Sequence, residues 1–394
     1  MRLLVIGAGM MGSAAAFDMA RSARVEQITL ADSDLRRATE AAKRIDRLAG
    51  PKRVHPVRLD ASNARAVTAL MRKHDGALSA VPYFFNLALA KAAVSARCHF
   101  ADLGGNSEIV RHELALGKQA AKHGIRLAPD CGLSPGLASI LGGELMRRIG
   151  GRADALKIYV GGLPLEPRPP FHYQLVFSVE GLINEYAEPA KILRKGKVTT
   201  VEPLTEVETF RIPGFPELEA FHTSGGTSTL PETFAGRVGE CFEKTLRYPG
   251  HAAQIRALYD FGLFSRTPRK LGKQTMIPRE LIASLFMENF SGNSPDVTVM
   301  RIEAQKGTRV FSFTLVDKYD PRTKLTSMMR TTAWPASIVL QMLVSGEVSA
   351  TGAVLHERDI PAQQFLAEMA ARSVAILFDA TGDPHPVKTR TSRN

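Results

Sequence analysis

The stretch RLLVIGAGMMGSAAAFDMARSARVEQITLAD, residues 2–32, decides the fold that we predict for this chain. It begins with an apolar run of strand length and ends with a second one. Three glycines separate the first strand from a helix: Gly7, Gly9 and Gly12. Glycines at this spacing allow a tight turn, a close approach of the backbone to a pyrophosphate and close packing of the helix on the sheet. The pattern predicts a dinucleotide-binding unit with a helix N-terminus facing the phosphates.

Asp32 ends the second strand about 20 residues after the last of these glycines, where a carboxylate can accept hydrogen bonds from the adenosine ribose. Because its charge would repel a 2′-phosphate, we expect NAD rather than NADP. Arg36 and Arg37 follow Asp32, and their positive charges keep NADP as the alternative cofactor. The alternative for the glycine motif itself is a tight turn that binds no ligand. The predicted cofactor-binding residues are Gly7, Gly9, Met10, Met11, Gly12, Asp32, Asp60, Ala80, Val81, Pro82, Leu103 and Gly104.

The composition is that of a globular protein of two or three domains. Of the 394 residues, 44% are hydrophobic and 23% charged, and no apolar run approaches the roughly 20 residues of a membrane span. The first strand begins at Arg2, so we expect no targeting peptide. The three cysteines lack metal-ligand spacing, so we expect no metal and a cytoplasmic location: Cys98, Cys131 and Cys241. The net charge of +12 is dispersed, so neither nucleic acid nor membrane is expected as a partner.

Strands and helices alternate through residues 1–133, which predicts a Rossmann domain with a doubly wound parallel sheet. The predicted strands are 2–6, 28–31, 54–59, 75–80, 98–103 and 124–128. The predicted helices are 10–21, 33–48, 63–73, 84–97 and 107–123. Ligands of such sheets bind outside the carboxyl ends of the strands.

That rule gathers several side chains on one rim of the predicted sheet. Asp60 is placed to help hold adenine, although it could equally cap the helix 63–73. The loop of residues 81–83 would pass beside the nicotinamide. Asp102 and Asp130 are candidate site acids, and each has helix capping as its alternative.

The composition changes beyond residue 133, and residues 134–326 predict an α+β domain for substrate binding and dimerisation. Several segments alternate apolar and polar residues, as a half-exposed, mostly antiparallel sheet does, and this sheet could cover the cofactor or pair with another subunit. The predicted strands are 156–161, 173–179, 197–203, 297–304 and 309–316, and the predicted helices are 137–149, 181–186, 249–262 and 279–290. Residues 327–380, with helices 327–344 and 361–378, should return to the Rossmann domain, and residues 381–394 should be disordered.

Three polar clusters in the second domain are candidates for chemistry. The segment SVEGLINEY, residues 178–186, brings two carboxylates within about one helical turn, where they could hold a cationic amine or form a capping box. The segment FHTSGGTS, residues 221–228, offers hydroxyl and backbone donors for a carboxylate, unless it is an ordinary turn.

The third cluster is KTLRYPGH, residues 244–251. Arg247 offers a two-pronged donor for a substrate carboxylate. His251 could transfer protons near neutral pH, although a lone histidine is more often structural. Nucleophile elbows, metal-binding histidine pairs and P-loops do not occur in the sequence, so hydride transfer is the reaction class that we predict.

Seven motifs together resemble the saccharopine dehydrogenase-like family, and within it the lysine 6-dehydrogenases. They are GAGMMG, SAVPY, DLGGN, PDCGLSPG, SVEGLINEY, TSGGT and TLRYPGH, in this order. The resemblance covers about residues 1–375, and the motifs from Pro129 onward are the more specific ones. It implies a Rossmann domain completed by C-terminal helices, an α+β substrate domain, a homodimer or higher oligomer, and action on amino-acid amines.

The resemblance implies NAD-dependent oxidative deamination of the L-lysine ε-amine. Ammonia is released, and the 6-semialdehyde cyclises to piperideine-6-carboxylate. The roles implied are Glu180 or Glu185 for the amine, Thr223, Ser224 and Arg247 for the carboxylate, Asp102 or His251 for proton transfer, and Tyr83 beside the substrate. Two alternatives remain open. One is a reductase that joins an amine and an aldehyde, as in saccharopine or carboxynorspermidine synthesis, with NAD(P)H; the other is a non-catalytic NAD-binding regulator.

Overall fold

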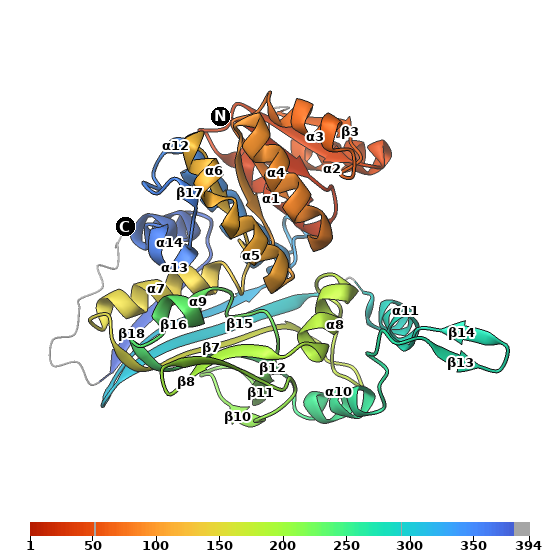
Figure 1. Ribbon diagram of the computed structural model, residues 1–394, viewed down its shortest axis with the longest axis vertical. Helices are drawn as coiled ribbons and strands as arrows, with labels where there is room; N and C mark the ends of the chain where they lie inside the picture. Colours follow the sequence, from red (N-terminus) through yellow and green to blue (C-terminus); the bar gives the residue numbers. More distant parts are fainter. Residues whose placement is uncertain (51–52, 293, 382–394) are drawn as a thin grey trace.

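The chain folds into two sheet-based domains that lie one above the other in Figure 1. The computed structural model describes residues 1–50, 53–292 and 294–381. The predicted disordered tail lies outside these residues apart from Thr381. Among the described residues, no helix combines the length and the apolar character that crossing a membrane requires.

The upper domain contains a parallel sheet with the strand order β17-β6-β5-β4-β1-β2-β3, which confirms the predicted doubly wound fold. Its strands are β1 (Arg2–Ile6), β2 (Gln27–Asp32), β3 (Val54–Arg58), β4 (Gly76–Ser79), β5 (His99–Asp102), β6 (Arg126–Ala128) and β17 (Gly352–Ala353). The last strand was not predicted, because two residues carry no periodicity. The reversal of strand order beside β1 opens a crevice at the carboxyl ends of the strands.

The helices of this domain are α1 (Met10–Arg21), α2 (Leu35–Ala49), α3 (Ala64–Met71), α4 (Asn86–Ala96), α5 (Ser107–Ala115) and α6 (Gly117–Lys122), with a 3₁₀ turn η1 (Tyr83–Phe85) before α4. The single helix predicted over 107–123 is therefore two helices. The interruption comes where Gly117 packs on β17: a Cβ on this glycine would lie 2.8 Å from the Cβ of Ala353.

The lower domain is built on a nine-stranded sheet with the order β10-β11-β12-β7-β15-β16-β18, which β8 and β9 extend beside β12. Only the pair of β7 and β12 is parallel in its described part, so the prediction of a mostly antiparallel sheet is confirmed. The strands are β7 (Ala153–Pro164), β8 (Ala190–Arg194), β9 (Lys197–Val201), β10 (Glu208–Phe210), β11 (Leu218–His222), β12 (Val238–Arg247), β15 (Asp296–Lys306), β16 (Arg309–Lys318) and β18 (Leu377–Thr381).

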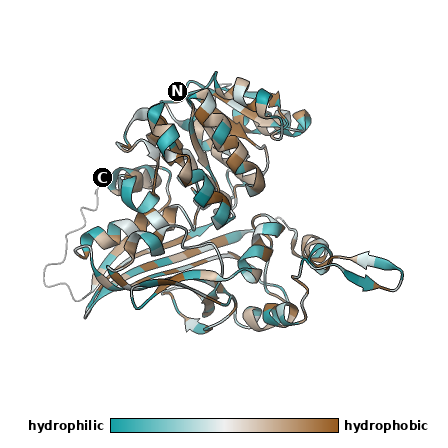
Figure 2. Cartoon of the chain, viewed as in Figure 1, coloured by the Kyte–Doolittle hydropathy of each residue, from teal (hydrophilic) through white to brown (hydrophobic). Residues whose placement is uncertain are grey.

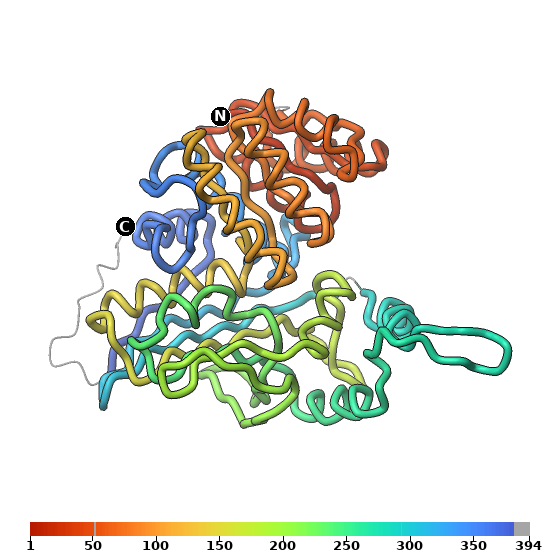
Figure 3. The backbone as a smooth tube through the Cα atoms, viewed as in Figure 1, coloured from red at the N-terminus to blue at the C-terminus, as the bar shows by residue number. Residues whose placement is uncertain are grey.

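The helices of this domain lie on the face of the lower sheet that is turned toward the upper domain and at one end of the sheet, as the backbone trace in Figure 3 also shows. They are α7 (Leu137–Arg148), α8 (Val179–Ala187), α9 (Leu230–Phe234), α10 (His251–Asp260) and α11 (Pro278–Phe290). A hairpin of β13 (Arg269–Leu271) and β14 (Gln274–Met276) projects from the body before α11, and Figure 2 shows its strands as mainly hydrophilic.

Two predicted elements of the second half were wrong. Residues 173–179 do not form a strand, because their large side chains, including Tyr173 and Val176, fill cores on both sides of an irregular segment. The predicted helix 361–378 is the shorter α14 (Ala362–Ala371), which ends where Ser373 adopts φ +61° and Val374 N–H returns to the Met369 carbonyl. The chain then crosses to the lower sheet as β18.

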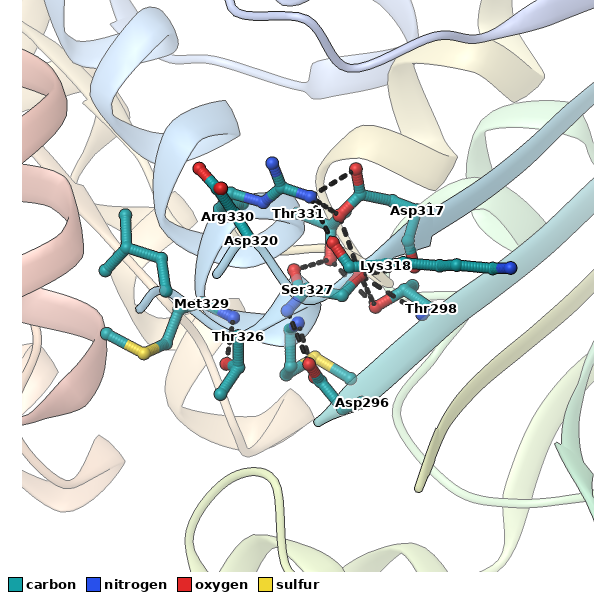
Figure 4. Close-up of polar contacts among 12 residues, drawn as sticks. Asp296, Thr298, Asp317, Lys318, Asp320, Thr326, Ser327, Met329, Arg330 and Thr331 are labelled. Carbon is teal, nitrogen blue, oxygen red and sulfur yellow. Dashed lines mark hydrogen bonds and ion pairs between the residues drawn. The ribbon is translucent and has the colours of Figure 1, made fainter. Parts of the chain in front are cut away.

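The helix α12 (Ser327–Ser345) joins the domains and packs against α1, β4 and β5, as expected of a segment returning to the Rossmann domain. The following α13 (His356–Asp359) packs on α7. Figure 4 shows how α12 is fixed at its start. Asp296 at the beginning of β15 accepts from Ser327 N–H at 2.6 Å and from Met328 N–H at 2.9 Å, and Arg330 donates to both carboxylate oxygens of Asp317 at 2.7 Å. The polar start of α12 thus ties the sheet of one domain to the core of the other.

Candidate active site

The glycine loop after β1 has the shape that a dinucleotide pyrophosphate requires. Gly7 adopts φ +104°, and a Cβ there would lie 2.6 Å from the Ala80 carbonyl oxygen. A Cβ on Gly12 would lie 1.8 Å from the carbonyl oxygen of Gly7, whereas a Cβ on Gly9 would have no neighbour within 4 Å. The outer two glycines therefore serve packing, and the middle one leaves open space in front of the α1 N-terminus. Met10 and Met11 supply the first residues of α1 at this site.

Asp32 is buried at the end of β2 and is held by the backbone. Its Oδ2 accepts from Ala8 N–H at 2.8 Å and its Oδ1 from Asp34 N–H at 2.9 Å, which leaves acceptor capacity for ribose hydroxyls. The guanidinium of Arg37 lies 4.0 Å from Oδ2 and lines a cavity of about 290 Å³ between α1 and α2. The predicted acid is in place, with a cation beside it that offsets its charge.

Arg36, the other basic residue predicted here, turns away to pair with Asp34 at 3.6 Å. Asp60 closes the turn after β3, where its Oδ1 accepts from the Ser62 N–H at 2.9 Å and the Ser62 hydroxyl at 2.7 Å. It does not cap the next helix, because Asn63 does so through its bond to Ala66 N–H.

The loops after β4 and β5 meet at the same rim, where the nicotinamide was predicted. Ala80, Val81 and Pro82 lead from β4 into η1, and Leu103 and Gly104 follow β5. A Cβ on Gly105 would lie 3.1 Å from the Cβ of Tyr83. The structure thus brings the residues predicted for the nicotinamide end into one place.

Asp102 and Asp130 lie side by side beneath this rim, and neither caps a helix, since Asn106 caps α5 and Gly136 precedes α7. Asp102 is fully buried, and its Oδ1 accepts from Gly104 N–H at 2.7 Å, Asn86 Nδ2 at 3.1 Å and Asp130 N–H at 3.2 Å. Burial raises the pKa of Asp102 to about 7 and that of Asp130 to about 6. Asp102 is enclosed rather than open to a substrate.

Asp130 connects the rim to the second domain. Its Oδ2 accepts from the Ser228 hydroxyl at 2.6 Å, and the hydroxyl of Ser134 donates to the Gly226 carbonyl at 3.2 Å. Residues 223–228, the predicted TSGGTS cluster, therefore lie against the Rossmann rim. In Figure 1, α8 and α9 lie on the face of the lower sheet that is turned toward the upper domain.

Behind this loop the second domain brings together the buried Glu243 and Arg247 and the partly exposed Glu185, whose side chain is 29% exposed. Arg247 Nη2 lies 3.9 Å from Glu185 Oε2, and its guanidinium stacks on the Tyr173 ring at 4.8 Å. Glu243 accepts from the hydroxyls of Thr223 at 3.1 Å and Thr245 at 3.3 Å. Burial raises the pKa of Glu185 to about 7, although Arg247 opposes the shift.

Burial, together with the charge of Glu185, raises the pKa of Glu243 to about 8. Glu243 was not predicted, although the sequence carries a signal for it. Glu243, Thr245 and Arg247 alternate along β12 and so share one face of the strand. No strand was predicted over residues 238–247, so this alternation was missed.

His251 is buried at the start of α10 and has both ring nitrogens occupied. Because Nδ1 donates to the Phe171 carbonyl at 2.9 Å, Nε2 is the acceptor for the Tyr186 hydroxyl at 2.9 Å. Burial and the nearby Arg247 lower the pKa of His251 to about 3. Arg247 Nε donates in turn to the Tyr186 oxygen at 3.3 Å. This geometry favours a role for His251 in holding Tyr186 and Arg247 over the proton transfer suggested by the sequence.

The remaining predicted residues divide into two groups. Glu180 is half exposed and paired with Arg279 at 3.0 Å, and Ser178 caps α8 through Gly181 N–H, as the capping alternative proposed. Ser224 N–H donates to the Glu185 carbonyl at 3.0 Å and fixes that segment against the loop. Glu185, Thr223, Ser224 and Arg247 are therefore brought together, whereas Glu180 is engaged elsewhere.

Comparisons with known proteins agree with this arrangement. Residues 3–127 match the model of the saccharopine dehydrogenase NADP binding domain, and residues 132–374 match that of the saccharopine dehydrogenase C-terminal domain. A saccharopine dehydrogenase [NADP(+), L-glutamate-forming] of Pyricularia oryzae is 26% identical over 273 residues, which are 66% of this chain and 58% of that protein. A mitochondrial alpha-aminoadipic semialdehyde synthase of Mus musculus is 24% identical over 67% of this chain and 28% of that protein. The match thus spans about half or less of these relatives.

Two solved structures share the fold over nearly the whole chain. The apo saccharopine dehydrogenase (L-Glu forming) of Saccharomyces cerevisiae aligns with a TM-score of 0.77 at 17% identity, covering 96% of this chain and 99% of that one. The homospermidine synthase of Legionella pneumophila, solved in complex with NAD, aligns with a TM-score of 0.69 at 12% identity, covering 100% and 95%. These likenesses show the two-domain fold.

Proposed function

This chain belongs to the saccharopine dehydrogenase family, and from that premise we propose that it is a nicotinamide-dependent oxidoreductase that oxidises the ε-amine of L-lysine. One observation carries the proposal: the buried Glu243 and the partly exposed Glu185 lie next to a single nearby guanidinium, that of Arg247, behind a loop that touches the predicted nicotinamide rim. Two carboxyls beside one cation suit a substrate that brings an amine and one carboxylate.

Glu185 has the properties of a general base for such an amine. A lysine ammonium, with a solution pKa near 10.4, must lose a proton before its carbon can release hydride. A base is most effective when its pKa is close to the working pH, and the pKa of Glu185 is about 7. Arg247, which donates to Tyr186, would then receive the substrate carboxylate.

The proposed reaction balances with these groups. The nicotinamide supplies the hydride acceptor when bound. As the C–H bond of the neutral amine breaks, its nitrogen lone pair forms the C=N bond of an iminium. Water adds to this carbon with loss of a proton, for which Glu185 is the base that we propose. The C–N bond then breaks to release ammonia and the aldehyde, which cyclises onto the α-amine.

The alternative is a reductase that joins an amine to an aldehyde. The relatives named saccharopine dehydrogenase and alpha-aminoadipic semialdehyde synthase favour it, and Arg37 beside Asp32 could accommodate an NADP phosphate. Saccharopine, however, carries two more carboxylates than lysine, and the carboxyl groups of Glu185 and Glu243 would oppose them. Lysine is therefore the substrate that we propose first, and NAD, which suits the charge of Asp32, the cofactor.

The test is NADH or NADPH production by the purified chain with lysine, ornithine, saccharopine and polyamines, each with NAD and with NADP. We expect reduction of NAD with lysine alone and an equal amount of released ammonia. Turnover of saccharopine without ammonia would establish the alternative. Tight cofactor binding without turnover of any amine, or of amine–aldehyde pairs in the reducing direction, would point to a regulator.

A further inference from the structure

Glu113 on α5 is a buried acid that the proposed reaction does not use. It is 1% exposed, and neither of its carboxyl oxygens meets a hydrogen-bond donor among the described residues. Asp102 Oδ2, which is also buried, shares this lack of a donor. The side chains of Glu113 and Asp102 nevertheless lie within hydrogen-bond reach of each other.

Two carboxyl groups can share a hydrogen bond only when one of them keeps its proton, because ionised carboxylates accept but do not donate. The charged groups that act on Glu113 are Asp102 and Asp130, both acids, and with burial they raise its pKa to about 10. Asp102 Oδ1 accepts from three donors, which stabilise the ionised form of that carboxyl, whereas Glu113 accepts from none of the described residues, so the proton resides on Glu113.

The opposite oxygen of Asp102 shapes the loop at the nicotinamide rim. Its three donors include the backbone of Gly104 and of Asp130. Gly104 adopts φ +71° and lies so close to Asp130 that a Cβ would fall 1.8 Å from its Oδ1. The loop of residues 103–105 is thus folded around the Asp102 carboxylate, and any rotation of that carboxylate would move it.

We propose that Glu113 is a positioning residue: its protonated carboxyl donates to Asp102 Oδ2 and fixes the carboxylate that holds residues 103–105 against the nicotinamide. Asp102 then acts as the anchor of this loop rather than as a proton carrier. The inference rests on the nicotinamide site of the proposed function but not on the identity of the amine.

The experiment measures NADH binding by fluorescence in the absence of any amine, and compares Glu113→Gln with Glu113→Leu. The amide of glutamine can still donate to Asp102, so we expect binding within about twofold of the parent chain. Leucine leaves Asp102 Oδ2 buried without a donor, and we expect binding about tenfold weaker or worse. Equal binding by a folded Glu113→Leu variant would overturn the proposal.

An infrared measurement identifies the proton directly. At mildly alkaline pH, the parent chain should show the carbonyl stretch of a protonated carboxylic acid, and Glu113→Gln should lack it. Raising the pH through about 10 should abolish this band and weaken NADH binding together, and only the parent chain should show that coupled loss. This titration also decides the matter if Glu113→Leu does not fold. A band that survives in Glu113→Gln, or NADH binding that does not follow the band, would refute the role.

Because neither measurement uses an amine, both stand if lysine proves to be the wrong substrate. A failure of the proposed function would appear as absent turnover with intact NADH binding. A failure of this inference would appear as intact NADH binding in Glu113→Leu.

Discussion

At the scale of single residues, Glu185 should determine how activity depends on pH. Its carboxyl titrates near pH 7, so the proposed base is protonated below that pH and ionised above it. We expect kcat/KM for lysine to rise with pH through about 7. Glu185→Gln should remove this limb and lower kcat by about a hundredfold or more, the usual contribution of a general base.

Glu180→Gln is the matched control, because Glu180 lies on the same helix but is half exposed and paired with Arg279. It should keep the parent pH profile. Full turnover by Glu185→Gln, or an equal loss of kcat in Glu180→Gln, would show that Glu185 is not the general base. Glu243 would then be the next residue to substitute.

The residues that could be assigned from sequence are those whose roles depend on local geometry. Gly7 and Gly12 are required by contacts within one strand–turn–helix unit, and Asp32 follows from the length of that unit. The roles of the other predicted site residues depend on partners that are distant in sequence. His251 is occupied by the Phe171 carbonyl, and Glu180 by Arg279. The sequence alone identifies an acid and a histidine, but it does not show whether their side chains are already bonded to other residues.

At the scale of elements, periodicity was informative where an element was long enough to express it. The helix α1 was predicted at its observed bounds, and β15 and β16 were predicted within two residues at each end. In contrast, β17 and β18 are short, and they form strands because they pair with β6 and β16 at the edges of the two sheets. The strand β12 was missed because it carries charged and hydroxyl side chains in its buried second half, where an apolar pattern would be expected.

The start of α12 offers a test of how the two domains are joined. Arg330 and Asp317 form a buried ion pair, and burial raises the pKa of Asp317 even with Arg330 in contact (Figure 4). Removing one partner should therefore leave an uncompensated charge. We expect Asp317→Ala to lower the free energy of unfolding by about 3 to 5 kcal/mol, as measured by urea denaturation.

The paired substitution separates charge burial from the ion pair itself. Asp317→Leu combined with Arg330→Met should recover most of the loss, because two apolar side chains bury no charge. If the double variant were as unstable as Asp317→Ala, the hydrogen bonds from Ser327 to Asp317 and from Arg330 to the Lys318 carbonyl would be the more important contacts.

At the scale of the whole molecule, the Rossmann domain and the mostly antiparallel second sheet were both predictable, since each follows from a repeated pattern. The path of the last segment was not. It contributes β17 to one sheet and β18 to the other, so it pairs with strands of both domains instead of returning to the Rossmann domain alone. That path depends on which sheet edges remain unpaired, a property of the assembled fold.

The projecting hairpin suggests how two copies would associate. Residues 266–275, which we name the arm, are exposed throughout, and β13 and β14 pair only with each other among the described residues. An isolated two-stranded hairpin is marginally stable in water, so a partner surface is expected. The arm carries four cations and an exposed leucine: Arg266, Arg269, Lys270, Lys273 and Leu271. The neighbouring α11 exposes complementary groups: Glu280, Glu288, Leu281 and Leu285.

These two surfaces are complementary in charge and apolar character, which a two-fold symmetric pair requires, because each arm can then reach α11 of the other copy. We therefore expect a homodimer in solution, and replacing residues 266–275 by a short Gly-Ser turn should give monomers in sedimentation experiments. Lys270→Glu with Lys273→Glu should weaken the dimer, and adding Glu280→Lys with Glu288→Lys should restore it, since the charges are then exchanged across the interface. High salt should weaken the parent dimer for the same reason. A monomeric parent chain, or a dimer unaffected by loss of the arm, would place any interface elsewhere, with the exposed edge of the second sheet as the next surface to test.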